Sequence, residues 1–299
     1  MPILLDNDQS SLIKTDRRQV AFGIDVGCAE REHVITNLVG KRALVTGAAS
    51  GIERAVSGEM ASNGCTLLLT ALEAEELARF EVDLGSSAVP VAAKAADLTD
   101  NLDRLTLLEW LRSRTRSLDI LINNAGVGGK FGPFVTADTA EMEKVVALNV
   151  LGTIHLTHEL MPLLRDQPEA WIVNISSGIA RLPYPGLAVY GATKAFISSF
   201  SESLACELAR TRIRVMCFHP GFTLTGFMAR SEMDMGRVPR FLLHSPEWIA
   251  GRLVLALRRD RTWVYSDIIT GLSARFGLLL PHRLRVRLFR NLFWTLPNE

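Results

Sequence analysis

The sequence predicts an α/β protein with a doubly wound, mostly parallel seven-stranded sheet and helices on both faces. From about residue 40, short apolar segments alternate with helical patterns, which is typical of βαβ units. The run Trp171–Ile175 is mainly apolar and ends at Ser176 and Ser177, as expected of a buried parallel strand. The chain has 299 residues, of which 48% are hydrophobic, so it can bury one large core.

The expected strands and helices follow one another along the chain. We predict strands near 42–46, 65–70, 89–93, 119–123, 171–176, 213–218 and 263–265. We predict helices near 51–63, 73–82, 101–115, 138–165, 188–210 and 246–258. Right-handed crossovers make such a sheet doubly wound, and ligands then bind at the carboxyl ends of its strands.

Charge and cysteine content exclude several classes of protein. The net charge of +1 gives no global attraction to nucleic acid. The four cysteines show no metal-type spacing and fit a reducing compartment better than a disulfide framework. We see neither a secretory signal nor an apolar run of about 18 residues, so we expect a cytoplasmic protein without a spanning helix.

Tyr190 and Lys194 are separated by four residues, so on a helix both side chains lie on one face. An ammonium group close to a phenol favours the phenolate and lowers the tyrosine pKa from about 10 toward neutrality. The pair therefore predicts an acid/base group.

Further motifs lie where the strands are expected to end. Thr46-Gly47-Ala48-Ala49-Ser50-Gly51-Ile52 joins a strand to a helix through a glycine turn, an arrangement that holds phosphate. Asn123-Asn124-Ala125-Gly126, Leu148-Asn149-Val150, and Pro220-Gly221 with Thr225 follow further along the chain, and Ser177 precedes Tyr190 by thirteen residues.

These motifs, in this order and at these spacings, resemble those of the short-chain dehydrogenase/reductase family over roughly residues 38–265. The resemblance implies a Rossmann-like domain and an NAD(P)-dependent oxidoreductase that interconverts an alcohol and a ketone. It assigns the catalytic residues to Asn149, Ser177, Tyr190 and Lys194. Tyr190 would transfer a proton, Lys194 would lower its pKa and bind the nicotinamide ribose, Ser177 would bind the substrate oxygen, and Asn149 would hold a relay water.

The resemblance also assigns the cofactor site. Asp97 and Leu98 would border adenine, Asn124 would hold the central strands together, and the Thr225 hydroxyl would meet the carboxamide. The full set is Gly47, Ser50, Gly51, Ile52, Asp97, Leu98, Asn124, Ala125, Gly126, Tyr190, Lys194, Pro220, Gly221, Thr223 and Thr225.

Glu53 departs from the family pattern, because it stands where the third glycine of the turn is expected. A carboxylate pointing inward would reduce affinity for the pyrophosphate, whereas one pointing to solvent would cost little. After the second strand, Ala71 and Leu72 provide neither an acid for the NAD ribose nor a base for a 2′-phosphate. We favour NADP over NAD because no carboxylate there repels the phosphate.

Two regions leave alternatives open. The stretch 222–245 is either a substrate-covering loop, as the resemblance implies, or an ordinary surface loop. In the segment 266–299, leucines at 284, 288 and 292 and arginines at 283, 287 and 290 predict a basic amphipathic helix. This helix packs on the domain or another subunit, lies on an anionic membrane surface, or shapes a lipophilic pocket.

We divide the chain into an extension (1–37), flexible or packed on the surface, a dinucleotide-binding and catalytic domain (38–265), and the basic segment (266–299). We expect a homodimer or homotetramer through the helices 138–165 and 188–210. His155 and His158 do not make a metal site, and His219 is either structural or close to the nicotinamide. The predicted substrate is a lipophilic small molecule. The alternative is a dinucleotide-binding protein with weak or no catalysis because of Glu53.

Overall fold

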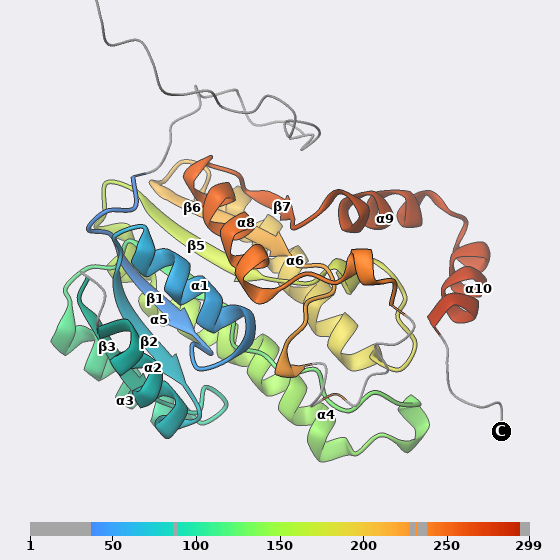
Figure 1. Cartoon of the computed structure of the whole chain (residues 1–299), viewed down its shortest axis with the longest axis horizontal. Coiled ribbons are helices and arrows are strands. Elements are labelled where there is room, and N and C mark those ends of the chain that lie inside the picture. Colours follow the sequence, from blue (N-terminus) through green and yellow to red (C-terminus); the bar gives the residue numbers. More distant parts are fainter. Residues whose placement is uncertain (1–36, 86–88, 228–230, 232–237, 294–299) are drawn as a thin grey trace, which may run out of the picture.

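Seven parallel strands form the centre of the molecule in the computed structural model, which describes residues 37–85, 89–227, 231 and 238–293. The order across the sheet is β3-β2-β1-β4-β5-β6-β7, so the chain starts in the middle and winds to both edges (Figure 1). The strands are Arg42–Thr46 (β1), Thr66–Ala71 (β2), Val91–Ala95 (β3), Ile120–Asn123 (β4), Ala170–Ile175 (β5), Ile213–His219 (β6) and Trp263–Tyr265 (β7). This order and the parallel pairing confirm the predicted doubly wound sheet. The predicted extension 1–37 lies outside the described residues except for Asn37.

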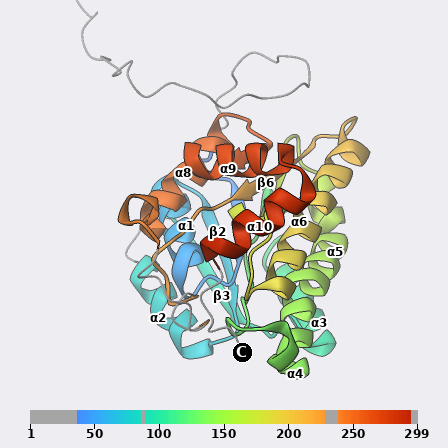
Figure 2. The same ribbon diagram turned by 90° about the vertical axis from the view of Figure 1, so that its right-hand side faces the viewer.

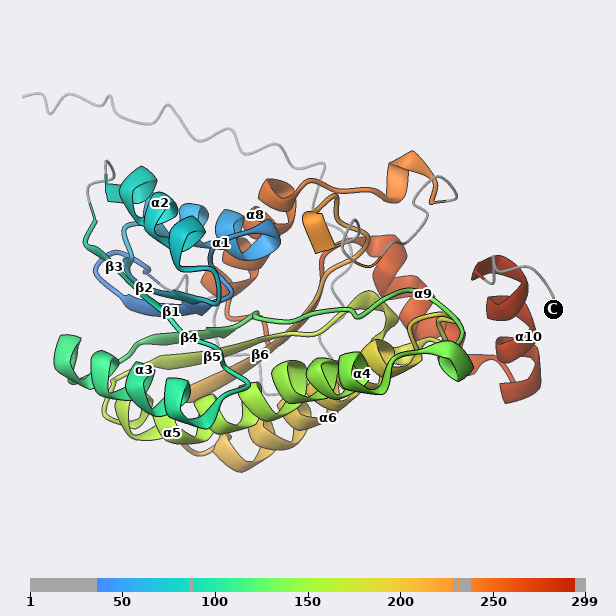
Figure 3. The same cartoon turned by 90° about the horizontal axis from the view of Figure 1, so that it is seen from below.

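Helices cover both faces of the sheet (Figure 3). One face carries α1 (Gly51–Ser62), α2 (Ala74–Gly85) and α8 (Pro246–Arg258), and the other carries α3 (Asn101–Arg114), α5 (Thr153–Arg165) and α6 (Ala188–Leu208). Successive strand residues point to opposite faces, so Ala43 and Val45 join the first core while Leu44 joins the second.

The prediction of one continuous helix over 138–165 is wrong in one respect, because the structure has no regular α-helix over the whole range. A π-helical segment, Ala147–Gly152, joins α4 (Thr139–Val146) to α5. Such a segment inserts an extra residue into a helical turn and often occurs at functional sites. The apolar pattern continues on both sides of it, so the sequence does not reveal the wider turn.

Two helices follow β7. The sequence analysis did not predict α9 (Ile268–Leu279), which begins at Asp267, whose side chain accepts a 2.8 Å hydrogen bond from the Thr270 backbone N–H. α10 (His282–Phe293) lies within the predicted basic segment. Both helices stand at one end of the molecule, and Figure 2 looks onto α10. Among the described residues, no helix has the length and apolarity needed to span a bilayer.

A buried carboxylate ties the strands together at the end opposite to these helices. Asp119, just before β4, accepts hydrogen bonds from the Arg42 backbone N–H (2.9 Å) and side-chain Nε (3.0 Å). The Lys41 ammonium lies 3.6 Å from the other carboxylate oxygen. Arg42 also donates to the Gln167 side chain, in the turn before β5. One residue thereby connects β1 to β4 and, through Arg42, to the turn before β5.

Asp119→Ala should lower the free energy of unfolding by about 3 kcal/mol, because it leaves buried donors and two cations without their partner. The matched control is Asp83→Ala. Asp83 pairs with Arg54 at 2.8 Å, but both side chains are largely exposed, so its loss should cost less than about 1 kcal/mol. Urea unfolding of both variants measures the difference, and equal losses would contradict a special role for Asp119.

Candidate active site

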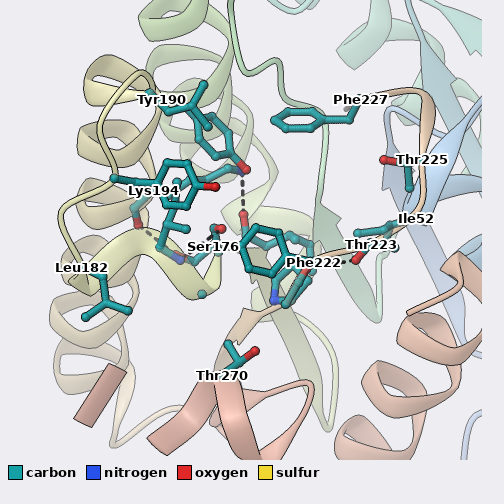
Figure 4. Close-up of a pocket in the computed structure, with 18 of the residues that line it drawn as sticks. Ile52, Ser176, Leu182, Tyr190, Lys194, Phe222, Thr223, Thr225, Phe227 and Thr270 are labelled. Carbon is teal, nitrogen blue, oxygen red and sulfur yellow. Dashed lines mark hydrogen bonds between the residues drawn. The ribbon is translucent and has the colours of Figure 1, made fainter. Parts of the chain in front are cut away.

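A pocket of about 310 Å³ opens at the carboxyl ends of β4, β5 and β6, beside the glycine turn after β1. This size falls within the range of small-molecule pockets, roughly 300–1,000 Å³. Figure 4 shows Tyr190, Lys194 and Ser176 on one side, Ile52 and Thr225 on the other, and Thr270 of α9 at the edge. The pocket thus lies where ligands bind in a doubly wound sheet.

Tyr190 and Lys194 project into this pocket from the first two turns of α6. The Lys194 Nζ lies 5.7 Å from the centre of the Tyr190 ring and donates a 2.9 Å hydrogen bond to the Ile175 carbonyl at the end of β5. Ser177 lines the same pocket as Tyr190 and Lys194. The structure therefore brings three of the four predicted catalytic residues together.

The pKa of Tyr190 differs from the sequence expectation. Burial raises this pKa above its usual range, the polar Ser177 side chain opposes the rise, and the Glu53 carboxylate adds to it. Lys194 is not among the causes, because its ammonium points to the Ile175 carbonyl instead of the phenol oxygen. In the protein alone, Tyr190 is a neutral phenol at neutral pH and hence a proton donor.

Burial has the opposite effect on Lys194. It lowers the pKa of this lysine to about 8, although the charges of Glu53 and Cys217 act to raise it. A buried ammonium loses hydration that one carbonyl bond replaces only in part. Lys194 therefore titrates close to the physiological range.

Asn149, the fourth predicted catalytic residue, lies behind the pocket and does not line it. It is buried in the π-helical segment and bonds to both backbone groups of Val127, with the Val127 N–H donating at 2.9 Å and the Asn149 Nδ2 donating to the carbonyl at 2.9 Å. Its Nδ2 also lies 3.1 Å from the Thr193 hydroxyl, next to Lys194. Asn149 thus positions α6 against the 126–127 backbone, and the relay water remains a prediction.

The glycine turn has the predicted backbone form. Gly47 and Gly51 have φ values of +75° and +60°, which favour glycine. The Glu53 side chain folds back over this turn: a Cβ on Gly51 would lie 2.9 Å from the Glu53 Oε2, and one on Gly47 would lie 3.1 Å from its Cγ. Glu53 also lines the pocket. Of the two orientations considered, the structure has the inward one.

The predicted cofactor residues fall into two groups. Those lining the pocket are Gly51, Ile52, Asn124, Gly126, Tyr190, Lys194, Pro220, Gly221, Thr223 and Thr225. Those outside it are Gly47, Ser50, Asp97, Leu98 and Ala125. Leu98 is buried in the core, and the Asp97 carboxylate accepts bonds from the Thr99 backbone and hydroxyl at 2.8 and 2.7 Å.

Asn124, just after β4, bonds to β1 through its backbone N–H, which donates to the Thr46 hydroxyl at 3.0 Å. Its neighbour Asn123 joins β4 to the other side of the sheet, because its Nδ2 donates to Asn174 of β5 (2.8 Å) and to Thr157 of α5 (2.9 Å). The buried Nδ2 of Asn124 has no hydrogen-bond partner and lies at the pocket.

These features fit a nicotinamide dinucleotide on one condition. A glycine turn at a helix N-terminus suits a pyrophosphate. The pocket lining also contains the polar residues Asn124, whose buried Nδ2 has no hydrogen-bond partner, Thr225 beside Gly51, and Lys194. The condition is that the Glu53 side chain turns away from the glycines that it now covers.

Much of the remaining lining of the pocket is apolar, and most of it comes from the two stretches for which the sequence left alternatives open, 222–245 and 266–299. The residues of this lining are Leu182, Tyr184, Leu187, Phe222, Phe227, Leu242, Ile269, Phe289 and Leu292. The Phe227 ring lies 5.2 Å from the Tyr190 ring, centre to centre (Figure 4). The apolar run after Asp267 was the available signal for the α9 part of this lining.

The three histidines considered in the sequence analysis are structural or exposed. His219 is buried, bonds to the Ser198 hydroxyl (3.1 Å) and the Val264 carbonyl (3.2 Å), and does not line the pocket. Burial lowers its pKa to about 4. His155 and His158 are exposed on α5, and the described residues include no cluster that could hold a metal ion.

The depressed Lys194 pKa predicts a specific pH dependence of stability. The unfolded chain releases this proton near pH 10.5 and the folded chain near pH 8, so between these values the unfolded state binds more protons and stability rises with pH. The free energy of unfolding of the wild type, relative to Lys194→Met, should therefore increase by an amount of the order of 3 kcal/mol across this window.

Urea unfolding at several pH values measures this difference. The contribution of Tyr190 to the pH dependence is common to both proteins and therefore cancels. The same comparison with Lys144→Met, at an exposed position on α4, should stay flat. A flat result for Lys194 would show that its ammonium is solvated.

Known proteins resemble the chain in sequence and structure. The family model for short chain dehydrogenases matches residues 41–236. A sulfoacetaldehyde reductase from Chromohalobacter salexigens is 35% identical over 185 residues, covering 62% of this chain and 73% of the relative. A probable NADP-dependent dehydrogenase from Haemophilus influenzae is 33% identical, covering 60% and 70%.

Among solved structures, a short-chain dehydrogenase from Sphingobium yanoikuyae in complex with NADPH matches with a TM-score of 0.72 and 28% identity, over 86% of this chain and 96% of the other. The matched family model covers the glycine turn, Ser177, Tyr190 and Lys194, the residues that meet at the pocket. The chain therefore belongs to the short-chain dehydrogenase/reductase family and is a nicotinamide-dependent oxidoreductase.

Proposed function

We propose that the protein interconverts an alcohol and a ketone on a lipophilic small molecule, with Tyr190 as the acid. The observation that carries this proposal is that Tyr190 and Ser177 line the same pocket, most of whose other lining side chains are apolar. A carbonyl oxygen placed beside both hydroxyls would accept two hydrogen bonds while its hydrocarbon part contacts the leucine and phenylalanine side chains.

Each residue then has a distinct task in carbonyl reduction. The bound nicotinamide supplies the hydride. Tyr190, which is protonated at neutral pH, gives its proton to the substrate oxygen. Ser177 donates a hydrogen bond to the same oxygen and fixes its position. Lys194, held by the Ile175 carbonyl, lines the same pocket and would bind the nicotinamide ribose. Asn149 keeps α6 in register through Thr193.

NADP is the proposed cofactor, with NAD as the alternative. Ala71 ends β2 without an acidic side chain, and Leu72 beside it is exposed, so no carboxylate repels a 2′-phosphate there. The Haemophilus influenzae relative is named as NADP-dependent, and the Sphingobium yanoikuyae structure holds NADPH.

The proposal includes a cytoplasmic homodimer or homotetramer formed through α4 and α6. Exposed apolar side chains on this side support it: Val146 and Leu151 line a shallow groove between α4 and Val189, and Phe196 is exposed on α6. A two-fold interface would cover these side chains.

A second candidate function follows from Glu53. A carboxylate over the glycine turn repels the dinucleotide phosphates, so the protein would bind a dinucleotide weakly and turn over slowly or not at all. The intact Tyr190–Ser177 pair favours the catalytic proposal over this one.

Tyr190→Phe should reduce the rate of ketone reduction by about 10³-fold, because it removes the proton donor. NADPH oxidation with a long-chain methyl ketone and an aryl ketone measures this, and the Kd for NADPH should change less than about twofold, since the ring stays in place. Tyr265→Phe, the same chemical change outside the pocket, is the matched control and should keep wild-type activity. Robust activity of Tyr190→Phe would overturn the assignment of the acid.

Glu53→Gly should tighten NADPH binding about tenfold or more, because it removes both charge and bulk from the turn. Glu53→Gln, which removes only the charge, should fall between the two. Calorimetric titration with NADPH and NADH measures all three proteins, with Glu109→Gln on exposed α3 as the control. An unchanged affinity would show that Glu53 moves aside at little cost. No binding of either nucleotide to the wild type would favour the weakly catalytic alternative.

A further inference from the structure

α9 has an inverted pattern of burial. The residues that it buries are small: Gly271, Ala274 and Gly277. Gly271 packs on the Tyr265 ring, and a Cβ at Gly277 would overlap with Leu182, so large side chains do not fit on this face. Its large apolar side chains point outward, with exposed fractions between 44% and 77%: Ile268, Ile269, Leu272, Phe276, Leu278 and Leu279. A helix that only covers a core buries its large apolar side chains and exposes its polar ones.

α10 extends this apolar surface. Phe289 is buried near Gly277, whereas four other apolar side chains are exposed: Leu284, Val286, Leu288 and Leu292. Leucines at 284, 288 and 292 form one stripe, and arginines at 283, 287 and 290 form another on the other side of the helix. We call the ten exposed apolar side chains of the two helices the α9–α10 face. A contiguous surface of this kind marks an interaction site.

The charge around this face selects its partner. Between residues 268 and 293 the sequence has five arginines and no acidic residue. In a two-fold dimer the same patch meets itself, so these arginines would face one another and repel. An anionic lipid surface attracts the arginines and also accepts the apolar side chains between its head groups. Long arginine side chains reach the head groups while their stems stay apolar.

The face adjoins the pocket. Ile269, Thr270 and Ser273 of α9 and Phe289 and Leu292 of α10 line the pocket, and Ile269 and Leu292 belong to the face as well. In Figure 1 the two helices form one end of the molecule, away from α2 and α3. A surface bound there would contact the pocket rim.

We propose that the α9–α10 face binds an anionic lipid membrane surface and holds the pocket mouth against it. Lipophilic substrates then enter from the lipid instead of from water, a consequence that rests on the proposed function. The binding itself does not, because it needs neither cofactor nor substrate.

Flotation of the full chain with lipid vesicles tests this inference. The protein should float with vesicles of phosphatidylcholine and phosphatidylserine, and much less with phosphatidylcholine alone. The triple variant R283Q/R287Q/R290Q should bind the anionic vesicles about a hundredfold more weakly, since each arginine near such a surface strengthens binding about fivefold and the three factors multiply. L279S/L284S/L288S should also lose flotation, because it removes the inserted side chains.

Two matched variants control for charge and hydrophobicity. R116Q/R210Q/R212Q removes three exposed arginines near the amino ends of the strands, and V82S/L102S/L105S removes three exposed apolar side chains from α2 and α3. Both should float like the wild type. Thermal unfolding followed by circular dichroism checks that all variants are folded, and Tyr190→Phe should float normally, so loss of activity leaves this test unaffected.

Three results would overturn the inference. The wild type fails to float with anionic vesicles, or the face variants float as well as the wild type. In the third result, the wild type does not bind vesicles and sedimentation shows that it is an oligomer, whereas the face variants are smaller species. The face would then be an interface between copies of the chain.

Discussion

The attachment of α6 to β5 determines where the chemistry takes place. The Ser176 hydroxyl donates a 2.8 Å hydrogen bond to the Lys194 backbone carbonyl, and the Lys194 ammonium returns a bond to the Ile175 carbonyl. Asn174 donates to the Ser201 hydroxyl two turns further along α6. Each of these polar groups is buried, so any displacement of the helix leaves one of them without a partner. Tyr190 lies one turn before Lys194 and takes its position from this fixed register.

The fold follows from features that are local in the sequence. Alternating apolar strands and helical patterns specify which segments pair with the sheet, and right-handed crossovers leave few possible orders. Two features escape such reasoning. The π-helical segment differs from an α-helix by one residue within a continuous apolar pattern. α9 buries glycine and alanine and exposes leucine and phenylalanine, so its periodicity points away from the domain that it covers.

Site residues could be identified from motifs, but their electrostatics depend on burial and orientation, which motifs do not contain. The sequence places Tyr190 one turn from Lys194, yet only the structure shows that the ammonium is directed to a carbonyl and that burial raises the phenol pKa. The orientation of Glu53 likewise depends on a side-chain rotamer. Asn123 and Asn124 are adjacent in sequence, and only the structure shows that the side chain of the first bonds to β5 whereas the backbone N–H of the second bonds to β1.

The wider turn between α4 and α5 makes the length of this region critical. Each residue of an α-helix turns the chain by about 100°, so deleting one residue from Ala147–Gly152 would leave a regular helix but rotate α4 relative to α5. Either the side chains that α5 buries would turn away from the core, or the Asn149 amide would lose its bonds to Val127. Substitutions in this segment keep the phase of the two helices, whereas a single insertion or deletion does not. Variation in length along this family should therefore fall elsewhere, in the loops at the rim of the pocket.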